Sequence, residues 1–465
     1  MKESTLYEEV SQESKDVNSS QEKIVVNGLV NEEIEKQAIE NGTANEEIEY
    51  KVYKRRWAML GIFLLFAVVN CIQWIQYAII NNLVMKYYNV SSFAVDWTSI
   101  IFMAGFIPLI FPAMYILEKK GLKWTIFLGM LGTTIGAWIK AFSVSPNRFW
   151  GALVGQAFVG SSQAFLLGVP PNLAAVWFGS NEVSTACSLG VFGLLLGTAV
   201  GFPIPPFFVK NHDNVEDIGS DLSQMFYCTA GFCTVVLILV AGFFQAEPPL
   251  PPSPEQALKK INTEEASFFG GIKNLLMNRG FLLLIFTYAI NGGEEFAGQV
   301  GLVFIFGGML GTVIFGIILD KTHKYKETAL VTYALGALGM LMLTFSFGLR
   351  KQIIVFVTAF IFGLFNAGYM PVGFELGSEI TYPEPEGTTG GLVILTVQLM
   401  SVFHAMGYSE LVRGIGDKWA NIILTGTLVI GTIFTAMIPN DLRRQAAHKV
   451  KTSKHLPLPS VDMNP

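Results

Sequence analysis

Apolar runs of about 20 residues recur along the chain, and short polar or charged segments separate them. A helix of that length crosses the hydrocarbon core of a bilayer, whereas the strands of a membrane β-barrel would alternate apolar and polar residues. The runs therefore predict an all-α polytopic membrane protein. We place its twelve transmembrane helices at 57–81, 97–117, 123–142, 149–170, 183–206, 225–245, 280–291, 300–319, 328–348, 352–376, 388–411 and 419–438.

One connection divides these spans into two groups of six. It is charged, and its string Pro248-Pro249-Leu250-Pro251-Pro252 cannot lie inside a helix. The predicted organisation is a disordered acidic tail at 1–50, a six-helix bundle at 51–245, a linker at 246–279, a second six-helix bundle at 280–438 and a tail at 439–465.

Composition supports a membrane protein that carries no enzymatic chemistry. Hydrophobic residues make up 51% of the chain and charged residues only 14%, against about 25% charged in soluble domains. There is neither a glycine-rich phosphate loop nor a His/Cys/Asp cluster with metal-ligand spacing. We expect no enzyme activity, no cofactor, no metal and no nucleic-acid partner. The four cysteines lie in apolar runs and are predicted to be buried free thiols: Cys71, Cys187, Cys228 and Cys233.

Lysine and arginine predict the orientation in the membrane. With both termini cytoplasmic, 19 of these residues after residue 50 face inward and 8 lie outside or at the outer edge, Lys140 among them. Residues 1–50 hold 13 acidic and 4 basic side chains and no apolar core segment, so we expect the first span to serve as the insertion signal.

The seventh span is too short for an ordinary transmembrane helix. Gly280–Asn291 has 12 residues, about 18 Å of helix against about 30 Å of hydrocarbon. Omitting this span would turn Lys321, Arg443 and Arg444 outward, against the positive-inside bias. We therefore expect the segment to cross the membrane as a partial helix.

A local signature recurs in the two halves. Ile116-Leu117-Glu118-Lys119-Lys120 ends the second span, and Ile318-Leu319-Asp320-Lys321 ends the eighth. This repeat resembles the pattern of the major facilitator superfamily, in which two six-helix bundles are related to each other. An acid at this place can bind the N-terminus of a neighbouring helix and latch the cytoplasmic side, so Glu118 and Asp320 are candidate gating residues. The alternative is a solvated loop whose charges serve topology alone.

Polar and aromatic side chains interrupt several apolar spans. Such groups are costly in lipid and are expected to face a protein interior or a water-filled path. Glutamine amides that only hold helices together are the simpler interpretation. The first span carries its polar groups at helical spacing and therefore on one predicted face: Asn70, Gln73, Trp74, Tyr77 and Asn81. The fourth and eleventh spans add Gln156, Gln163 and Gln398.

These side chains suit a small organic cation. Aromatic faces attract a quaternary ammonium, and amide oxygens accept hydrogen bonds from a hydroxyl or a primary ammonium. The predicted spans hold no carboxylate near mid-membrane, because Glu375 and Glu379 lie at a span end. We therefore expect transport without proton coupling.

Longer strings resemble the family of feline leukaemia virus subgroup C receptor-related transporters (FLVCR family). They are Asn70-Cys71-Ile72-Gln73-Trp74-Ile75-Gln76-Tyr77, Pro170-Pro171-Asn172-Leu173-Ala174-Ala175-Val176-Trp177-Phe178-Gly179, Glu379-Ile380-Thr381-Tyr382-Pro383-Glu384-Pro385-Glu386-Gly387 and Asp441-Leu442-Arg443-Arg444-Gln445. The resemblance covers roughly 50–450. It implies a major facilitator fold and facilitative transport of choline or ethanolamine by alternating access.

The resemblance also implies a substrate pocket. Family positions that bind choline match Trp74, Gln163, Tyr288 and Gln398, and Asn70 and Tyr77 are added as candidates from the polar pattern. Members of the family continue for roughly 20 residues after the position of Ile290, a stretch that this chain does not have.

Two other functions stay open at this point. Haem export is the alternative within the family, although the spans offer haem only His404 and the edge residue Lys140. A non-transporting, receptor-like or shortened variant is the second alternative. The expected partners are the small cation, or haem, and the lipid bilayer, and the chain is expected to be a monomer in the plasma membrane. Mitochondrial and endoplasmic reticulum membranes are alternative locations.

Overall fold

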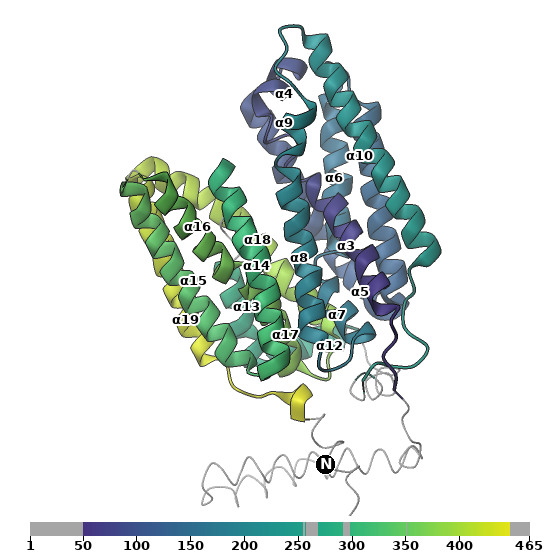
Figure 1. Ribbon diagram of the computed structural model, residues 1–465, viewed down its shortest axis with the longest axis vertical. Coiled ribbons are helices and arrows are strands. Elements are labelled where there is room, and N and C mark those ends of the chain that lie inside the picture. The colour runs from purple at the N-terminus through teal and green to yellow at the C-terminus, as the bar shows by residue number, and fades with distance from the viewer. Residues whose placement is uncertain (1–49, 254–255, 257–267, 292–297, 350, 447–465) are drawn as a thin grey trace, which may run out of the picture. The chain divides into compact units, whose positions relative to one another are not determined.

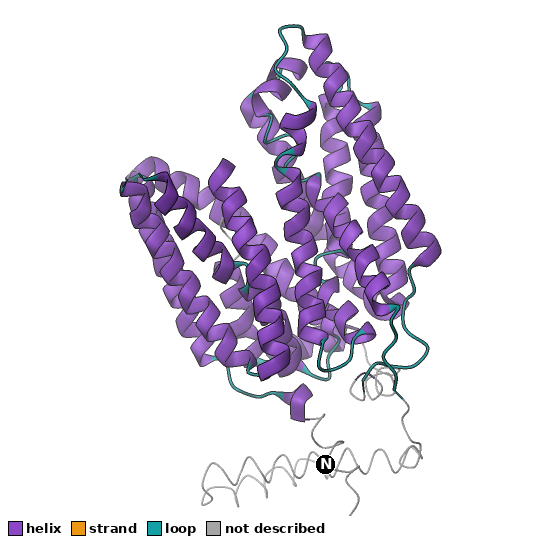
Figure 2. Ribbon diagram, in the orientation of Figure 1, coloured by secondary structure: helices purple, strands orange, loops and turns teal. Residues whose placement is uncertain are grey.

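The computed structural model describes residues 50–253, 256, 268–291, 298–349 and 351–446. Within these residues the regular secondary structure is helical (Figure 2). The predicted tail at 1–50 lies almost wholly outside them. The chain from Tyr50 onward forms one unit, and its helices fall into a first and a second bundle (Figure 1).

The first bundle is built around the long helix α5, which packs against α6 and α10, while α3 packs against α8. Its helices are α3 (Arg56–Ile72), α4 (Asn81–Tyr88), α5 (Ser92–Phe142), α6 (Phe149–Ser162), the 3-10 turn η2 (Gln163–Phe165), α7 (Val169–Trp177), α8 (Val183–Gly201), α9 (Ile204–Phe208) and α10 (Val215–Phe243).

A glycine divides α5 into two spans. The helix has 51 residues, about 77 Å at 1.5 Å per residue, which is far more than one crossing needs. Gly121 breaks it with φ 78° and ψ −179°, a conformation that a residue without a Cβ adopts readily. The break falls between the predicted spans 97–117 and 123–142.

In the second bundle α14 packs against α16, and α15 packs against α19. Its helices are α12 (Phe268–Met277), α13 (Arg279–Asn291), α14 (Gly298–Thr322), α15 (Tyr325–Gly348), α16 (Gln352–Asn366), α17 (Tyr369–Thr381), α18 (Glu386–Ile415) and α19 (Asp417–Met437). We refer to the end of the bundles that carries α12 as the α12 end and to the opposite end, which carries α4 and α9, as the α4 end (Figure 1).

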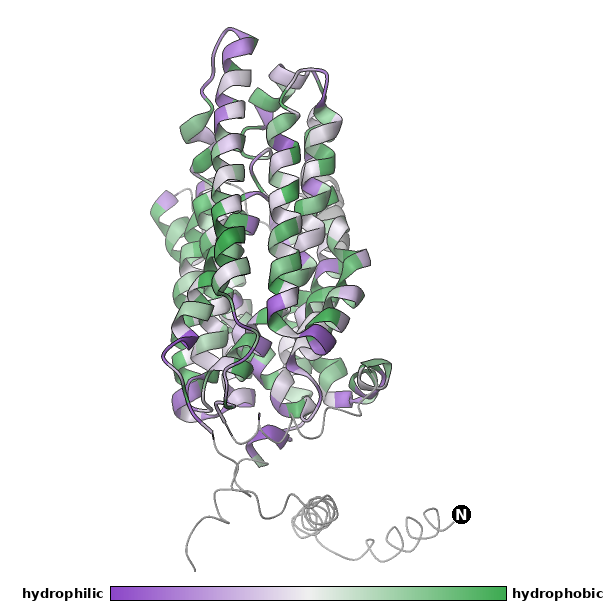
Figure 3. Cartoon of the chain, turned by 90° about the vertical axis from the view of Figure 1, so that its right-hand side faces the viewer, coloured by the Kyte–Doolittle hydropathy of each residue, from purple (hydrophilic) through white to green (hydrophobic). Residues whose placement is uncertain are grey.

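The described helices have the character of a multi-pass membrane protein. Seven are long and apolar enough to cross a bilayer, or nine if each of two bent helix pairs is one span. Hydrophobic residues follow the middle of the helices, and hydrophilic residues gather toward the ends (Figure 3). Large apolar side chains such as Phe111, Phe158 and Ile238 are exposed on the outside, which is how a surface that contacts lipid is built.

The first span is not the continuous helix that the sequence predicts over 57–81. α3 ends at Ile72, residues 73–80 form successive turns, and a separate helix begins at Asn81. The polar side chains of this segment therefore do not share one helical face. The turns are stabilised because the buried side-chain amide of Gln156 binds the backbone carbonyls of Gln73 and Trp74.

The structure describes the seventh span as far as Asn291, and its crossing as a partial helix stays a prediction. α13 has 13 residues and is bent by 82° from α12, from which a single residue, Asn278, separates it. The Gly292-Gly293-Glu294-Glu295 string lies outside the described residues.

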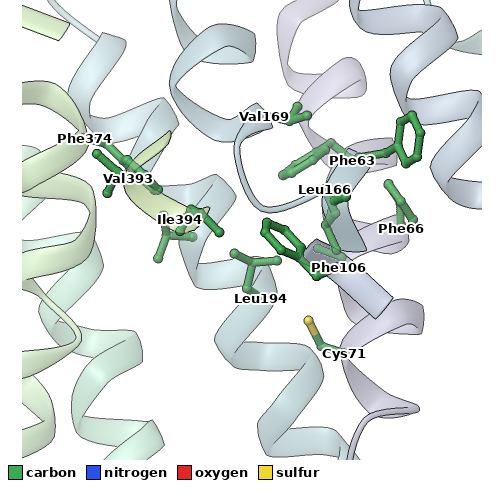
Figure 4. Packing of buried hydrophobic residues seen from close by; sticks show 14 of the residues in the cluster. Phe63, Phe66, Cys71, Phe106, Leu166, Val169, Leu194, Phe374, Val393 and Ile394 are labelled. Carbon is green, nitrogen blue, oxygen red and sulfur yellow. The ribbon is translucent and has the colours of Figure 1, made fainter. Parts of the chain in front are cut away.

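The two bundles share a hydrophobic core. Figure 4 shows Phe106 and Leu194 of the first bundle beside Ile394 of the second, all of them buried in one cluster. Of the cysteines, Cys71, Cys187 and Cys233 are buried free thiols as predicted. The prediction is wrong for Cys228, which is free but exposed because it lies on an outward face of α10.

Candidate functional site

Asn70 ties the end of α3 to two neighbouring helices. Its Nδ2 donates to Oγ1 of Thr133 on α5 (2.9 Å) and to the carbonyl oxygen of Val159 on α6 (3.1 Å). Asn70 is fully buried. The structure therefore gives this predicted substrate residue a set of helix-joining bonds, which fix the chain just before the turns of 73–80.

Trp74 stands out among the aromatic residues of the turns because it stays partly exposed. Its ring stacks on Phe102 of α5, with centroids 6.3 Å apart, and its buried Nε1 has no hydrogen-bond partner among the described residues. Tyr77, by contrast, is buried against Phe226 of α10, with centroids 5.3 Å apart. An aromatic face beside an unpaired donor can receive a ligand without first breaking a bond within the protein.

The predicted glutamines occupy two different environments. Gln163 begins η2, directly after α6 ends, and its side chain makes no hydrogen bond to the described residues. Gln398 on α18 is partly buried. Gln73 and Gln156 are fully buried and bound to backbone oxygens, Gln73 to that of Val69 at 2.9 Å. Gln163 is also buried, with 7% of the residue exposed, but its side chain makes no bond to the described residues that would hold the fold, as those of Gln73 and Gln156 do.

Tyr288 lies inside the second bundle. Its hydroxyl donates to the carbonyl oxygen of Met370, and its ring packs against Tyr369 and Phe374 at centroid distances of 5.1 and 6.0 Å. Only 3% of the residue is exposed. A Cβ on Gly373 would approach the Tyr288 ring to 2.3 Å, so the absent side chain makes room for it. The bonds of Tyr288 join α13 to α17.

Asp320 caps a helix of the opposite bundle. Its Oδ1 accepts from the backbone N–H of Ser184 (2.9 Å) and its Oδ2 from that of Thr185 (2.7 Å), in the first turn of α8. The residue before α8, Glu182, makes no side-chain cap. Because the first N–H groups of a helix have no partner within it, Asp320 supplies the acceptors that α8 needs.

Glu118 makes the corresponding contact from the first bundle to the second. Its Oε2 accepts from Oγ1 of Thr388, in the first turn of α18, at 3.1 Å. The Glu118 side chain is only 7% exposed. Nearby, a Cβ on Gly168 would approach the backbone of Gly391 to 3.2 Å, so small residues allow α18 to lie close to the first bundle. Both acids of the repeat thus join the bundles at the α12 end.

A cavity of about 330 Å³ adjoins these contacts. Its lining comes from both bundles and includes Ser180, Asn181, His323, Tyr325, Glu379 and Arg444. Trp74, Gln163, Tyr288 and Gln398 do not line it. The cavity and the pocket predicted from sequence are therefore separate features.

Arg444, just after α19, binds two buried carboxylates of α17. Its Nη2 lies 2.7 Å from Oε2 of Glu375 and its Nε lies 2.8 Å from Oε1 of Glu379. Burial alone would lower the pKa of Arg444, but Glu379 and Glu375 raise it well above its ordinary value. The segment after α19 is thereby fixed to α17 and, through Gln445, to the carbonyl oxygen of His323 at 3.0 Å.

Sequence reasoning missed three of these features. The sequence puts Lys140 at the outer edge but does not predict that its side chain is buried in the first bundle, where Gln76, Gln156 and Phe226 surround its ammonium. Thr388 and Arg444 carried no functional expectation. An apolar helix with one lysine near its end is typical of a membrane boundary, so only the facing glutamines could have signalled burial. The side chain of His404 lies outside the described part of α18.

Comparison with known folds defines the class. The family model of the Major Facilitator Superfamily matches residues 58–405. The Escherichia coli fucose:proton symporter FucP has a TM-score of 0.65 at 13% identity, covering 84% of this chain and 100% of that one. The proton:xylose symporter XylE has a TM-score of 0.65 at 14% identity, covering 84% and 99%. The fold is therefore that of a twelve-helix membrane transporter of this superfamily, as predicted.

Curated relatives identify the branch. The choline/ethanolamine transporter flvcr2a of Danio rerio is 41% identical, covering 86% of this chain and 89% of the relative. The choline/ethanolamine transporter FLVCR2 of Homo sapiens is 41% identical, covering 86% and 80%. An uncharacterized MFS-type transporter of Caenorhabditis elegans is 44% identical, covering 86% and 72%. The chain belongs to the FLVCR family of the Major Facilitator Superfamily and is a membrane transporter of that type.

Replacing Arg444 by alanine is expected to lower the free energy of unfolding by about 3–5 kcal/mol, because two buried carboxylates lose their partner. The measurement is thermal or denaturant unfolding of the purified protein in detergent. The neighbouring Arg443 is the matched control, since it pairs with Asp441 at the surface, where both side chains are about half exposed. Its replacement by alanine is expected to cost at most about 1 kcal/mol. Equal losses for the two variants would contradict the assignment.

Proposed function

We propose that this chain transports choline, ethanolamine or both as a uniporter, by alternating access. The relatives that carry these substrates in their names support the substrate class. The observation that carries the proposal is Trp74, whose ring is partly exposed at the turns of the first span and whose Nε1 is unpaired among the described residues. An indole face attracts a quaternary ammonium more strongly than other aromatic rings do.

Amides complement the aromatic face. The unbonded side chain of Gln163 and the partly buried Gln398 each offer an oxygen to a hydroxyl or a primary ammonium. Tyr288 acts less directly, because its hydroxyl is already bound and its ring lies against α17. The proposed pocket therefore depends on Trp74 and the two glutamines for contact and on Tyr288 for support. Asn70 and Tyr77 have the same supporting role in the first bundle.

Alternating access requires contacts that form in one state and break in the other. Asp320 and Glu118 provide such contacts at the α12 end, since each acid joins its own bundle to a helix of the opposite one. We propose that this end faces the cytoplasm of a plasma-membrane protein with both termini inside. The excess of lysine and arginine near this end supports the orientation.

Replacing Trp74 by alanine is expected to abolish saturable choline uptake, because a desolvated cation–π contact is worth about 2 kcal/mol or more. Trp74→Phe is expected to keep part of the uptake. Radiolabelled choline uptake, normalised to the amount of protein at the cell surface, is the measurement. Normal transport by Trp74→Ala would exclude the aromatic site.

Choline entry is expected to follow the membrane potential and not a sodium or proton gradient. For one positive charge, 100 mV contributes about 2.3 kcal/mol, which favours accumulation by about 50-fold at equilibrium. Raising external potassium should therefore slow net entry. Uptake that changes with external pH at constant voltage would show that the carrier is not a uniporter.

Asp320→Asn is expected to loosen the α12 end, because a neutral amide has one acceptor oxygen and no charge to place at the N-terminus of α8. A loss of about 1–2 kcal/mol would raise the population of the open form by about 5- to 30-fold. The reporter is maleimide labelling of Cys187, which is fully buried on α8, in a Cys228→Ser background. Asp96→Asn is the control, since Asp96 is exposed on α5. Unchanged labelling in Asp320→Asn would rule out the latch.

A further inference from the structure

Lys140 is the basic residue of α5 whose side chain is almost completely buried, with 1% exposed. Its Nζ donates to Oε1 of Gln156 on α6 (3.0 Å) and to Oε1 of Gln76 in the turns of the first span (3.2 Å). The ammonium also lies 5.7 Å from the centre of the Phe226 ring. Two amide oxygens and an aromatic face thus surround the charge. A buried lysine in a membrane span is costly, and residues of this kind usually serve the function of the protein.

The bonds of Gln156 show what this lysine does. The amide of Gln156 accepts from Lys140 through its oxygen, so its nitrogen faces the other way. That nitrogen donates to the carbonyl oxygens of Gln73 (3.1 Å) and Trp74 (3.4 Å). These carbonyls belong to the segment where the helix has ended, so no later turn of α3 binds them. In a bilayer such groups require partners from the protein.

The helices are also shaped to admit the lysine. A Cβ on Gly155 would lie 2.4 Å from Cγ of Lys140 and 2.8 Å from the carbonyl oxygen of Gly136. The stem of Lys140 therefore lies in the space between α5 and α6 that the absent side chain of Gly155 leaves open. Gln76, the second acceptor of Lys140, is anchored on its other side by Oγ1 of Thr229 on α10, at 3.4 Å. The charge thus connects the turns to three helices.

We propose that Lys140 is a positioning residue for substrate recognition. Its ammonium fixes the orientation of the Gln156 amide, which holds the backbone at Gln73 and Trp74 and so presents the Trp74 ring. Without the ammonium, the Gln156 amide loses the bond that selects one of its two orientations, and the flipped amide would point an oxygen at two carbonyl oxygens. The link to substrate rests on the function proposed above, whereas the holding of the turns does not.

The test uses the full-length protein in lipid nanodiscs and compares Lys140→Met, which keeps the stem and removes the donors, with the unchanged chain. Hydrogen–deuterium exchange at residues 73–80 is expected to become about tenfold faster, the effect of losing one charge-assisted hydrogen bond. Exchange in α15, in the other bundle, should not change. Lys86→Met is the matched control, because Lys86 is an exposed lysine of α4 that donates to a loop carbonyl, that of His212, and not to a side chain of the turns. Unchanged exchange at 73–80 in folded Lys140→Met would overturn the proposal.

Transport provides the second readout. In Lys140→Met the KM for choline should rise about tenfold, while the maximal rate per surface molecule falls less, because the pocket is disordered and the gate is not. Lys140→Gln, which keeps a donor, should recover part of the affinity. If Lys140→Met fails to fold, Lys140→Gln is compared with the unchanged chain instead. In a Gln156→Met background, removing the lysine should add little. If the effects of the two substitutions on KM were fully additive, Lys140 would not act through Gln156.

The two proposals fail in different ways. If Trp74→Ala transports choline normally while exchange at 73–80 still rises in Lys140→Met, the substrate site is wrong and the holding of the turns by Lys140 stands. If Trp74→Ala loses transport but Lys140→Met changes neither exchange nor KM, the site stands and the role of Lys140 is wrong.

Discussion

Every backbone polar group within a membrane needs a partner inside the protein, and this constraint determines how the chain can build a site. Several of the described spans interrupt their helices, among them the first at 73–80, the fourth around η2 and the tenth between α16 and α17. An interruption frees side chains to face a ligand but also frees carbonyls and N–H groups. At the first span, the amide of Gln156 on α6 binds the freed carbonyls of Gln73 and Trp74, and Lys140 donates to the oxygen of that amide. In the first bundle, the same bonds therefore satisfy the freed carbonyls and hold the segment that carries the proposed substrate contact, Trp74.

The same requirement explains why the bundles join where they do. The N-terminus of α8 makes no side-chain cap of its own and receives two acceptors from Asp320 of the opposite bundle. A carboxylate that caps a helix within its own bundle would stabilise one fold. A carboxylate that caps a helix of the other bundle stabilises one arrangement of the two bundles. When that contact breaks, the N-terminus of the capped helix is left with unpaired N–H donors. This is a contact whose free energy depends on the conformational state, as a transporter gate requires.

Hydrophobic runs predicted the class of fold because lipid imposes length and composition on every span. The position of the acids in the repeat predicted that Asp320 would meet a helix N-terminus, and it does so, although its gating role stays a prediction. The polar pattern of the first span was misleading, since Asn70 to Asn81 suits one helical face only if the helix continues. The periodicity of one span contains no information about the side chains of other helices. Here Gln156, bound by Lys140, supplies the hydrogen bonds that the carbonyls of the turns need. For the same reason Lys140 looked like an edge residue.

In the second bundle, α17 connects the proposed pocket with the α12 end. Met370 binds the Tyr288 hydroxyl near the start of this helix, and Glu375 and Glu379 bind Arg444 farther along. Met370 and Glu379 are separated by about 13 Å along the axis at 1.5 Å per residue. Because both ends of α17 are buried and bonded, any shift of Tyr288 has to move α17 or break a bond to it. The helix α13 carries Tyr288 and packs on α17, so a movement of α13 would be transmitted to α17.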